Sequence, residues 1–378
     1  MIDHLAKAKR IVVKVGSAIL VDSGAGHLKR DWLASLAADI AGLKKQRKDV
    51  IVVSSGAIAL GRRALKLKPN ALRLEESQAA AAAGQIRLAQ AYVDAFHEYD
   101  LAVAQILLTL EDTEERRRYL NARATLSTLI ALNAVPVINE NDTVATAEIR
   151  YGDNDRLAAR VASMMEADCL VLLSDIDGLY SANPQRDANA RHIAEVPAIT
   201  PEIERMAEGP VSGLSKGGME SKIAAAKIAT AAGAAVVIAS GHVLHPLRAI
   251  ADARTTLFVP RVSPTQARKR WIAGGLGAQG TIVIDTGAER ALHSGKSLLP
   301  VGVKAVNGAF ERGDAVVVKS EDGRDLGRGL IAYDASDARA LIGRRTVEIE
   351  AILGYRGRDE MIHRDDLALT SSDKETPS

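Results

Sequence analysis

Short apolar runs alternate with longer segments of helical periodicity over the first 260 residues, and this alternation constrains the fold more than any other feature. β-strands that alternate with helices imply right-handed crossovers and a mainly parallel sheet. Aromatic residues make up only 3% of the chain, which fits aliphatic strands buried between helices. We therefore expect an α/β fold, with strands at 10–15, 50–53, 101–108, 135–138, 169–173, 235–239 and 256–259.

The chain has 378 residues, which is too long for one ordinary core and suggests two domains. The pattern changes after Pro260, where a basic and glycine-rich stretch precedes short β-like segments separated by Gly and Asp turns. We expect an α/β domain over 1–260, a linker over 261–278, a small β domain over 279–356, and a partly disordered tail over 357–378.

Composition sets limits on the environment and partners. The single cysteine, Cys169, lies in an apolar run and suits a reducing compartment. Without a signal pattern or an apolar run of about 18 residues, we expect a cytoplasmic protein with no membrane partner. Residues 261–356 hold 15 Lys and Arg against 11 Asp and Glu, an excess of four positive charges that is too weak to predict nucleic-acid binding.

Polar residues gather directly after the apolar runs. Parallel sheets bind ligands at the carboxyl ends of their strands, so one rim should collect these residues. They are Lys14 with Gly16, Ser54-Ser55-Gly56, Asn139-Glu140-Asn141-Asp142, and Ser174-Asp175. A ligand site is therefore expected at this rim.

The segment 135–165 is predicted to be a buried strand, an acidic-amide loop and a helix that begins near Asp153. The loop carries two clusters of Asn and Asp. Because these residues are also favoured at helix N-caps, a plain capping role for Asn154 remains an alternative.

The stretch Ser215 to Lys222 places paired glycines, Gly217 and Gly218, before a predicted helix. Free N–H groups and the positive end of the helix dipole make such a turn suitable for phosphate. Together with Lys14 and the glycine turns after the first two strands, it predicts a phosphate cradle without a P-loop.

Three other patterns are weaker. Gly275 to Gly280 matches G-x-G-x-x-G, but it follows a basic stretch and precedes a strand, so a linker is the better interpretation. His242 and His245 are expected to be turn residues beside Pro246. No Walker A sequence and no histidine pattern for a metal site or a nucleophile pair is present.

The motifs resemble those of the glutamate 5-kinases of the amino acid kinase family, in order from about residue 10 to Val259. The motifs are Lys14-Val15-Gly16-Ser17, Ser54-Ser55-Gly56-Ala57-Ile58, Asn139-Glu140-Asn141-Asp142, Gly152-Asp153-Asn154-Asp155 and Gly217-Gly218-Met219. The second domain resembles a PUA domain through Arg268-Lys269-Arg270-Trp271-Ile272, Ser297-Leu298-Leu299-Pro300 and Ile352-Leu353-Gly354-Tyr355.

The resemblance implies a three-layer αβα sandwich followed by a PUA-like domain. It also implies ATP-dependent phosphorylation of the γ-carboxylate of L-glutamate to L-glutamyl 5-phosphate, the first step of proline synthesis. Mg²⁺ would be carried by ATP, with no protein metal site. Feedback inhibition by proline, a dimeric or tetrameric assembly, and handover of product to a glutamate-5-semialdehyde dehydrogenase are further implications.

Residue by residue, the resemblance assigns catalysis to Lys14, Lys222 and Asp155, with Asp155 orienting the lysines. Glutamate would be held by Ser55, Gly56, Asp142 and Asn154. The nucleotide would be bound by Lys14, Gly16, Ser174, Asp175, Lys216, Gly217, Gly218, Met219, Glu220, Ser221 and Lys222. The chain departs from the family at Lys216, which adds a charge, and at Ser221, which keeps the hydroxyl of the usual Thr.

The residues agree with this chemistry. A glutamate side chain has a pKa of about 4.3, so it is already ionised at neutral pH and needs no general base. Positioning and charge neutralisation then supply most of the catalysis of phosphoryl transfer. Two alternatives stay open: a sister kinase acting on acetylglutamate, aspartate, carbamate or uridylate, and an RNA-binding protein acting through the PUA-like domain.

Overall fold

The computed structural model describes residues 2–22, 26–68, 72–144, 154–207, 218–274 and 277–370. It divides into two compact units, Met1–Pro264 and Thr265–Ser378, which are described separately below. Within the described residues, no helix is both long and apolar enough to span a membrane.

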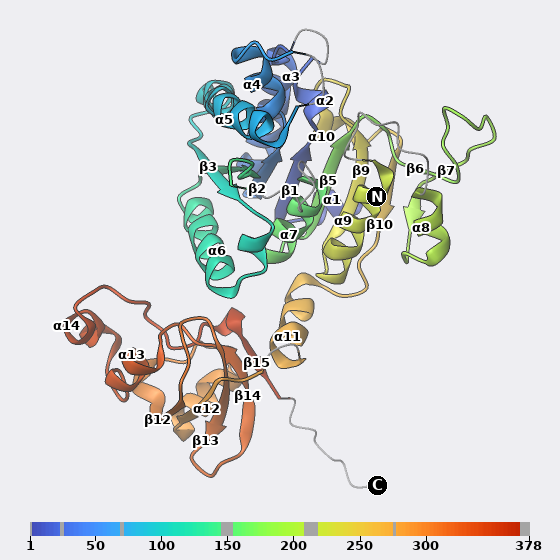
Figure 1. Cartoon of the computed structure of the whole chain (residues 1–378). Coiled ribbons are helices and arrows are strands. Elements are labelled where there is room, and N and C mark those ends of the chain that lie inside the picture. The colour runs from blue at the N-terminus through green and yellow to red at the C-terminus, as the bar shows by residue number, and fades with distance from the viewer. Residues whose placement is uncertain are drawn as a thin grey trace, which may run out of the picture. The chain divides into compact units, whose positions relative to one another are not determined.

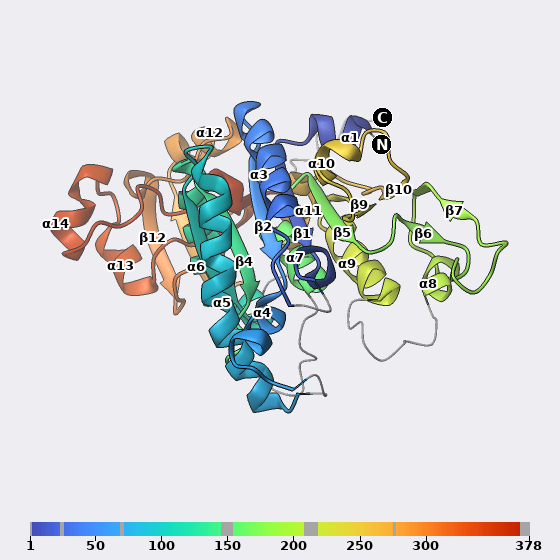
Figure 2. The same ribbon diagram turned by 90° about the horizontal axis from the view of Figure 1, so that it is seen from above.

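The first unit is built on an eight-stranded sheet in the order β3-β4-β2-β1-β5-β9-β10-β8 (Figures 1 and 2). Neighbouring strands are parallel except β9 and β10. The mainly parallel open sheet predicted from the sequence is therefore confirmed. The strands are β1 (Arg10–Val15), β2 (Asp49–Ser54), β3 (Val103–Leu108), β4 (Val135–Glu140), β5 (Cys169–Ser174), β8 (Glu195–Val196), β9 (Ala235–Ser240) and β10 (Thr255–Phe258), with β6 (Leu179–Tyr180) and β7 (His192–Ile193) forming a separate antiparallel pair.

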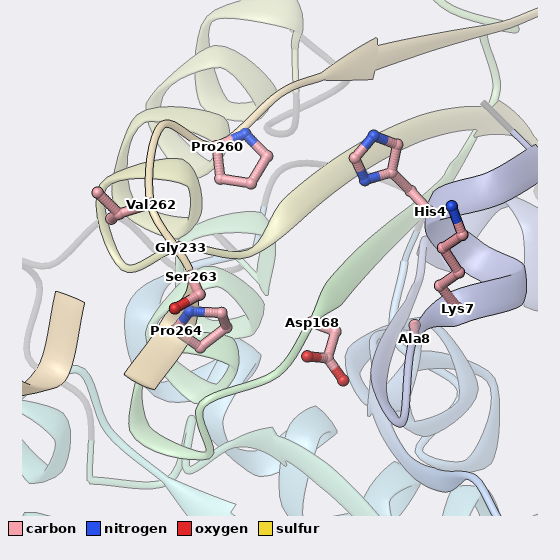
Figure 3. A pocket seen from close by; sticks show the side chains of 9 residues that line it. All are labelled: His4, Lys7, Ala8, Asp168, Gly233, Pro260, Val262, Ser263 and Pro264. Atoms are coloured by element: carbon pink, nitrogen blue, oxygen red, sulfur yellow. The ribbon is translucent and has the colours of Figure 1, made fainter. Parts of the chain in front are cut away.

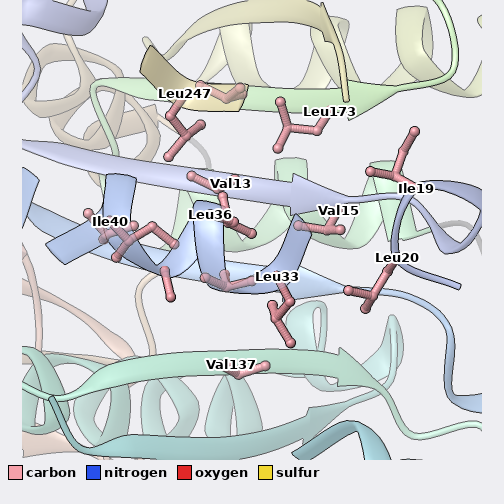
Figure 4. Close-up of a cluster of buried hydrophobic side chains, with 14 of the residues drawn as sticks. Val13, Val15, Ile19, Leu20, Leu33, Leu36, Ile40, Val137, Leu173 and Leu247 are labelled. Carbon is pink, nitrogen blue, oxygen red and sulfur yellow. The ribbon is translucent and has the colours of Figure 1, made fainter. Parts of the chain in front are cut away.

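Helices cover both faces of the sheet, as expected for three layers. Helices α3, α4 and α5 pack on one face, and their apolar side chains join those of the strands in one cluster (Figure 4). Helices α6, α7 and α9 contribute to a second cluster on the other face (Figure 1). The helices are α1 (Ile2–Lys7), α2 (Ser17–Leu20), α3 (Arg30–Lys45), α4 (Ala57–Ala64), α5 (Leu74–His97), α6 (Arg116–Ala131), α7 (Asn154–Met164), α8 (Pro201–Ala207), α9 (Met219–Ala231) and α10 (Pro246–Ala249), with a 3₁₀ turn at Glu111–Thr113.

The alternation of side chains along β1 decides which layer receives Lys14. Val13 and Val15 lie in the first cluster, whereas Val12 lies in the second. Successive residues of a strand point to opposite faces, so Lys14 shares the face of Val12. The strand therefore directs the Lys14 ammonium toward the layer of α7 and α9.

One sequence expectation about the end of an element needs correction. Strand β4 continues two residues beyond Ile138 because its pairing with β3 extends to Glu140. Asn139 is consequently a buried strand residue, not part of a solvated loop.

The second unit contains a five-stranded sheet in the order β12-β11-β13-β14-β15, with its own apolar cluster. The pairing is antiparallel except between β11 and β13. The strands are β11 (Gly280–Ile284), β12 (Val303–Gly308), β13 (Ala315–Ser320), β14 (Asp325–Leu330) and β15 (Leu367–Leu369); the helices are α12 (Thr286–His293), α13 (Ala335–Ala340) and α14 (Ile349–Leu353), with 3₁₀ turns at Pro300–Gly302, Thr346–Glu348 and Arg364–Asp366.

The expected tail over 357–378 begins too early. Met361 and Ile362 are fully buried, and β15 pairs with β14, because these apolar residues complete the core of the second unit. The buried ion pair between Arg268 and Asp366, at 2.5 Å, also ties this segment down. The segment expected as a linker contains helix α11 (Pro264–Gly274).

Candidate active site

The carboxyl ends of β4, β2, β1 and β5 form one rim of the first unit. Val15, at the end of β1, pairs with Ser54 of β2 and Leu173 of β5, so these ends are level with one another. Val53 of β2 pairs with Ile138 of β4, one residue before Asn139. Parallel registers thus bring together residues that lie far apart in the sequence.

An ion triad lies at this rim. Asp155, at the start of α7, places Oδ1 2.6 Å from Lys14 Nζ and Oδ2 3.2 Å from Lys222 Nζ. The Asp155 side chain is 1% exposed, and both lysine side chains are buried with it. Lys14 comes from β1 and Lys222 from the second turn of α9, so the rim of the sheet and two packed helices build the triad.

The two lysines keep Asp155 ionised. Burial alone would raise the pKa of Asp155, but the ammonium groups of Lys14 and Lys222 outweigh it and hold that pKa below its ordinary value. Asp155 is therefore a carboxylate, and the triad has a formal charge of +1. Because a buried excess charge is costly, the site favours an anionic ligand.

Asn154, the neighbour of Asp155, uses its amide nitrogen to join β2 and β4. Asn154 Nδ2 donates to Ser55 Oγ at 2.7 Å, to Asn139 Oδ1 at 3.1 Å and to the Ser54 carbonyl at 3.3 Å. Its Oδ1 atom is buried and has no hydrogen-bond partner among the described residues. Asn154 is the first residue of α7, and its side chain does not cap the helix, so the plain capping interpretation is wrong.

Helix α5 makes two hydrogen bonds to these rim residues. Gln85 Oε1 accepts a hydrogen bond from Asn139 Nδ2 at 2.7 Å, and Tyr92 OH donates to Ser54 Oγ at 2.9 Å. Burial raises the pKa of Tyr92, so its hydroxyl stays protonated and able to donate. A Cβ on Gly84 would lie 1.7 Å from the Ala57 carbonyl oxygen, which shows how closely α5 approaches α4.

Asp142 lies two residues beyond β4 and is buried. Burial, followed by the nearby Glu140 carboxylate, raises the pKa of Asp142 to about 7. Its Oδ1 atom has no hydrogen-bond partner among the described residues. A buried carboxylate with an open oxygen is suited to a cationic ligand group.

Comparison with known proteins identifies the family. Residues 9–240, which carry the strands from β1 to β9 and the whole ion triad, match the amino acid kinase family. The chain belongs to the amino acid kinase family. Residues 280–353 of this kinase match the PUA domain, as expected for its second unit.

Its relatives share nearly its whole length. It is 60% identical over 366 residues to a glutamate 5-kinase of Paramagnetospirillum magneticum (strain AMB-1), covering 97% of this chain and 99% of the relative. It is 62% identical over 367 residues to glutamate 5-kinase 1 of Mesorhizobium japonicum, covering 97% of both chains. A glutamate 5-kinase of Agrobacterium fabrum (strain C58) is 60% identical over 369 residues, covering 97% of this chain and 95% of the relative.

Two glycines of the amino acid kinase follow the strands that end at this rim. Gly16 follows β1, and a Cβ there would lie 3.9 Å from Lys14 Nζ and 3.5 Å from the Leu173 carbonyl oxygen. Gly56 has φ = 111° and turns the chain from Ser55 into α4, a conformation that favours glycine. Gly16 therefore lies close to the Lys14 ammonium of the triad.

The other residues that the sequence predicts to bind the nucleotide lie at the end of β5 and at the start of α9. Ser174 Oγ donates to Asp175 Oδ1 at 2.9 Å at the end of β5. Gly218 is the N-cap of α9, and Met219, Glu220 and Ser221 form the first turn that leads to Lys222. Lys216 and Gly217 lie outside the described residues.

Four residues of the kinase site carried no assigned role from the sequence: Ser54, Gln85, Tyr92 and Asn139. Asn139 could have been recognised as a polar residue that prolongs an apolar strand. Gln85 could not, because in an Ala-rich helix it looks the same as the exposed Gln90. Its role depends on the long-range contact between α5 and β4.

In the part of this kinase that the structure describes, no three His, Cys, Asp or Glu side chains are arranged to hold a metal ion. His245 has φ = 54° at the start of α10, and its Nδ1 lies 3.0 Å from Asp39 Oδ1. The turn interpretation of His245 fits this position.

A separate pocket of about 250 Å³ lies at the opposite rim (Figure 3). It is lined by His4 and Lys7 of α1, by Asp168 before β5, by Gly233 before β9, and by Pro260 and residues 262–264. Open parallel sheets bind ligands at the carboxyl ends of their strands, and this pocket lies at the amino ends of β1, β5 and β9. The ion triad therefore remains the candidate active site.

Proposed function

We propose that the chain transfers the γ-phosphoryl group of ATP to the γ-carboxylate of L-glutamate, forming L-glutamyl 5-phosphate for proline biosynthesis. The glutamate 5-kinases that are about 60% identical over nearly the whole chain support this substrate. The observation that carries the chemistry is the buried Lys14–Asp155–Lys222 triad.

The two lysines would neutralise the charge that opposes the reaction. A carboxylate nucleophile must approach the anionic phosphates of ATP, and preorganised ammonium groups lower that barrier. Asp155 would hold both ammonium groups in place between turnovers, because each of its oxygens contacts a different lysine. No proton has to be removed from the acceptor, since a glutamate side chain is ionised at neutral pH.

The amide and acidic residues would recognise the amino-acid end of glutamate. The open oxygens of Asn154 and Asp142 are acceptors for its α-ammonium. Ser55 Oγ already accepts a hydrogen bond from Asn154, so its own hydrogen is available to a substrate carboxylate. Gly56 would admit the substrate close to the backbone at this turn.

The nucleotide would lie along the glycine turns. Lys14, Gly16 and Lys222 would face the transferred phosphoryl group. Ser174, Asp175 and the segment 216–221 would hold the rest of ATP. Mg²⁺, when bound, would add positive charge to the phosphates. It would be held mainly by phosphate oxygens and water, since the Asp155 carboxylate is occupied by two lysines.

Regulation and assembly extend the proposal. Proline would inhibit the reaction, the chain would form a homo-oligomer in the cytoplasm, and the labile acyl phosphate would pass to a glutamate-5-semialdehyde dehydrogenase. These features are proposed from the kinship with glutamate 5-kinases.

Release of ADP from Mg-ATP, measured across several acceptors, tests the function. We expect turnover with L-glutamate and little with N-acetylglutamate, aspartate, carbamate or UMP. Preference for any of these other acceptors would refute the substrate. Added proline should reduce the rate. A parallel filter-binding measurement with tRNA should give weak or no retention, and tight retention would favour a role in RNA binding instead.

A further inference from the structure

The orientation of the Asn154 amide decides which chemical group the site can accept. An ammonium group only donates hydrogen bonds, so it can bind the amide oxygen but not the amide nitrogen. If the Asn154 amide rotated by half a turn, the same position would present N–H groups and repel an α-ammonium. Whatever fixes this orientation therefore determines selectivity for amino acids.

A chain of hydrogen bonds fixes the orientation. The Ser54 carbonyl is a backbone acceptor, so the Asn154 atom that lies 3.3 Å from it must be the nitrogen. That nitrogen also needs an acceptor on Asn139, which turns Asn139 Oδ1 toward it at 3.1 Å. Asn139 then directs its own nitrogen away from the site, where Gln85 Oε1 accepts it at 2.7 Å.

We infer that Gln85 is a positioning residue that selects acceptors carrying an α-ammonium group, an inference that rests on the proposed function. Gln85 holds Asn139 in the orientation that accepts from Asn154. Asn154 thereby keeps Oδ1, its one atom without a partner among the described residues, for the substrate. Gln85 acts through Asn139, to which it is hydrogen-bonded.

Helix α5 is closely packed on both sides of Gln85. Its neighbour Gly84 lies against the first residue of α4 so closely that an added Cβ would overlap the Ala57 carbonyl. Leu88 and Tyr92 on the same helix are fully buried, and Tyr92 contacts Ser54 on the rim. Gln85 is therefore held in a fixed place relative to β2 and β4.

Removal of the Gln85 acceptor leaves the Asn139 nitrogen without its partner. Rotation of the Asn139 amide would turn this nitrogen toward Asn154 Nδ2, and two donors cannot form a hydrogen bond. Asn154 would then lose one of the contacts that fix its amide. The binding of the α-ammonium should weaken, whereas the binding of carboxylates should not.

The test compares L-glutamate with glutarate, which has the same two carboxylates but no α-ammonium. Glutarate is measured as a competitive inhibitor against L-glutamate, so that its own turnover is not required. In Gln85→Met, which keeps the side-chain length, KM for L-glutamate should rise about 5-fold or more. Ki for glutarate and KM for ATP should stay within about 2-fold of the starting protein.

Two matched variants complete the experiment. Gln90→Met removes an exposed glutamine of the same helix, whose partner is Asp94, and should change none of these constants. Gln85→Glu keeps an accepting oxygen and should preserve the ratio of glutarate Ki to glutamate KM. Melting temperatures of all variants establish that each is folded.

The outcomes distinguish the positioning role of Gln85 from the proposed function. If L-glutamate and glutarate weaken equally in Gln85→Met, or if neither changes, the positioning role is wrong although the proposed function stands. If the unaltered protein does not phosphorylate L-glutamate, the proposed function is wrong and the role of Gln85 falls with it.

Discussion

Lys14 Nζ lies 2.6 Å from Asp155 Oδ1, although 140 residues separate the two in the chain. The second oxygen of the same carboxylate meets Lys222, so one buried Asp sets the position of two ammonium groups. The contact joins the central strand of the first unit to a helix that begins at the carboxyl rim. A fixed pair of cations of this kind would stabilise the charge that develops when a phosphoryl group passes between two anions.

The first prediction concerns Lys222. Lys222→Ala removes one of the two ammonium groups that are proposed to face the phosphates, and kcat should fall by about 10²-fold or more. Lys227 lies on the same helix but is about half exposed and pairs with Glu204, so Lys227→Ala is the matched control and should retain kcat. The measurement is steady-state ADP release with saturating glutamate and ATP. Equal kcat values in both variants would rule out a catalytic role for Lys222.

The second prediction concerns Asp155→Asn, which removes the carboxylate that contacts both buried ammonium groups. The folded protein should lose about 3 kcal/mol of unfolding free energy near pH 7, the scale of a broken buried ion pair. An anion can replace the carboxylate, so tripolyphosphate should raise the melting temperature of this variant more than that of the unaltered protein. Thermal unfolding with and without tripolyphosphate measures both effects.

The pH dependence of that loss follows from the lowered pKa of Asp155. A depressed pKa in the folded state adds stability above the ordinary value of 3.8, and this stability disappears as the pH falls through the folded-state pKa. The difference between Asp155→Asn and the unaltered protein should therefore narrow in acid. A difference that stays constant down to strongly acidic pH would contradict the assigned ion triad.

The third prediction concerns the pH dependence of glutamate binding through Asp142. Because burial raises the pKa of Asp142 to about 7, much of it is protonated below neutral pH and cannot accept an ammonium group well. The value of kcat/KM for glutamate should fall by about 10-fold per pH unit below 7. KM for ATP should not follow this trend. Asp142→Asn should show a low kcat/KM that no longer varies with pH in this range.

Asp142 also links function to stability. Its raised pKa means that the folded state holds a proton that the unfolded state releases between pH 3.8 and about 7, so the ionised group destabilises the protein at higher pH. Asp142→Asn should therefore raise the unfolding free energy at pH 8 by about 1–3 kcal/mol while glutamate binding weakens. Denaturant unfolding at pH 8 and pH 5 measures the effect, which should be smaller at pH 5. A destabilised variant at pH 8 would contradict the raised pKa.

The parallel sheet and its rim could be predicted because both depend on local patterns. Apolar runs separated by helical segments predict the strands, and the residues after each run, such as Lys14 and Ser55, fall at one edge by the geometry of parallel strands. The pairing of Asp155 with both lysines followed from resemblance and not from the pattern itself. Its geometry depends on how α7 and α9 pack, which no local pattern encodes.

Contacts between helix α5 and the strands could not be predicted from the sequence. Gln85 and Tyr92 lie in an Ala-rich helix whose register against β2 and β4 depends on the close contact between α5 and α4. The sequence does not predict the late end of β4, because polar residues such as Asn139 are typical of a loop when their buried partners are unknown. It also predicts too early a start for the tail, because Met361 and Ile362 are isolated apolar residues in a charged stretch.

The last prediction concerns this close contact between α4 and α5. A Cβ on Gly84 would lie 1.7 Å from the Ala57 carbonyl oxygen, and a Cβ on Gly61 equally close to the Ala80 carbonyl oxygen, so either helix must move to admit a methyl group. Gly84→Ala should lower the unfolding free energy by about 2 kcal/mol or more, as overpacking does. It should also raise KM for glutamate, because displacement of α5 moves Gln85 away from Asn139.

Gly42 in α3 meets nothing within 4 Å of its added Cβ, so Gly42→Ala should stabilise the protein by about 0.5–1 kcal/mol and leave KM unchanged. Denaturant unfolding and glutamate kinetics on both variants decide the matter, since equal behaviour of the two glycines would mean that α4 and α5 are not packed as closely as their backbones indicate.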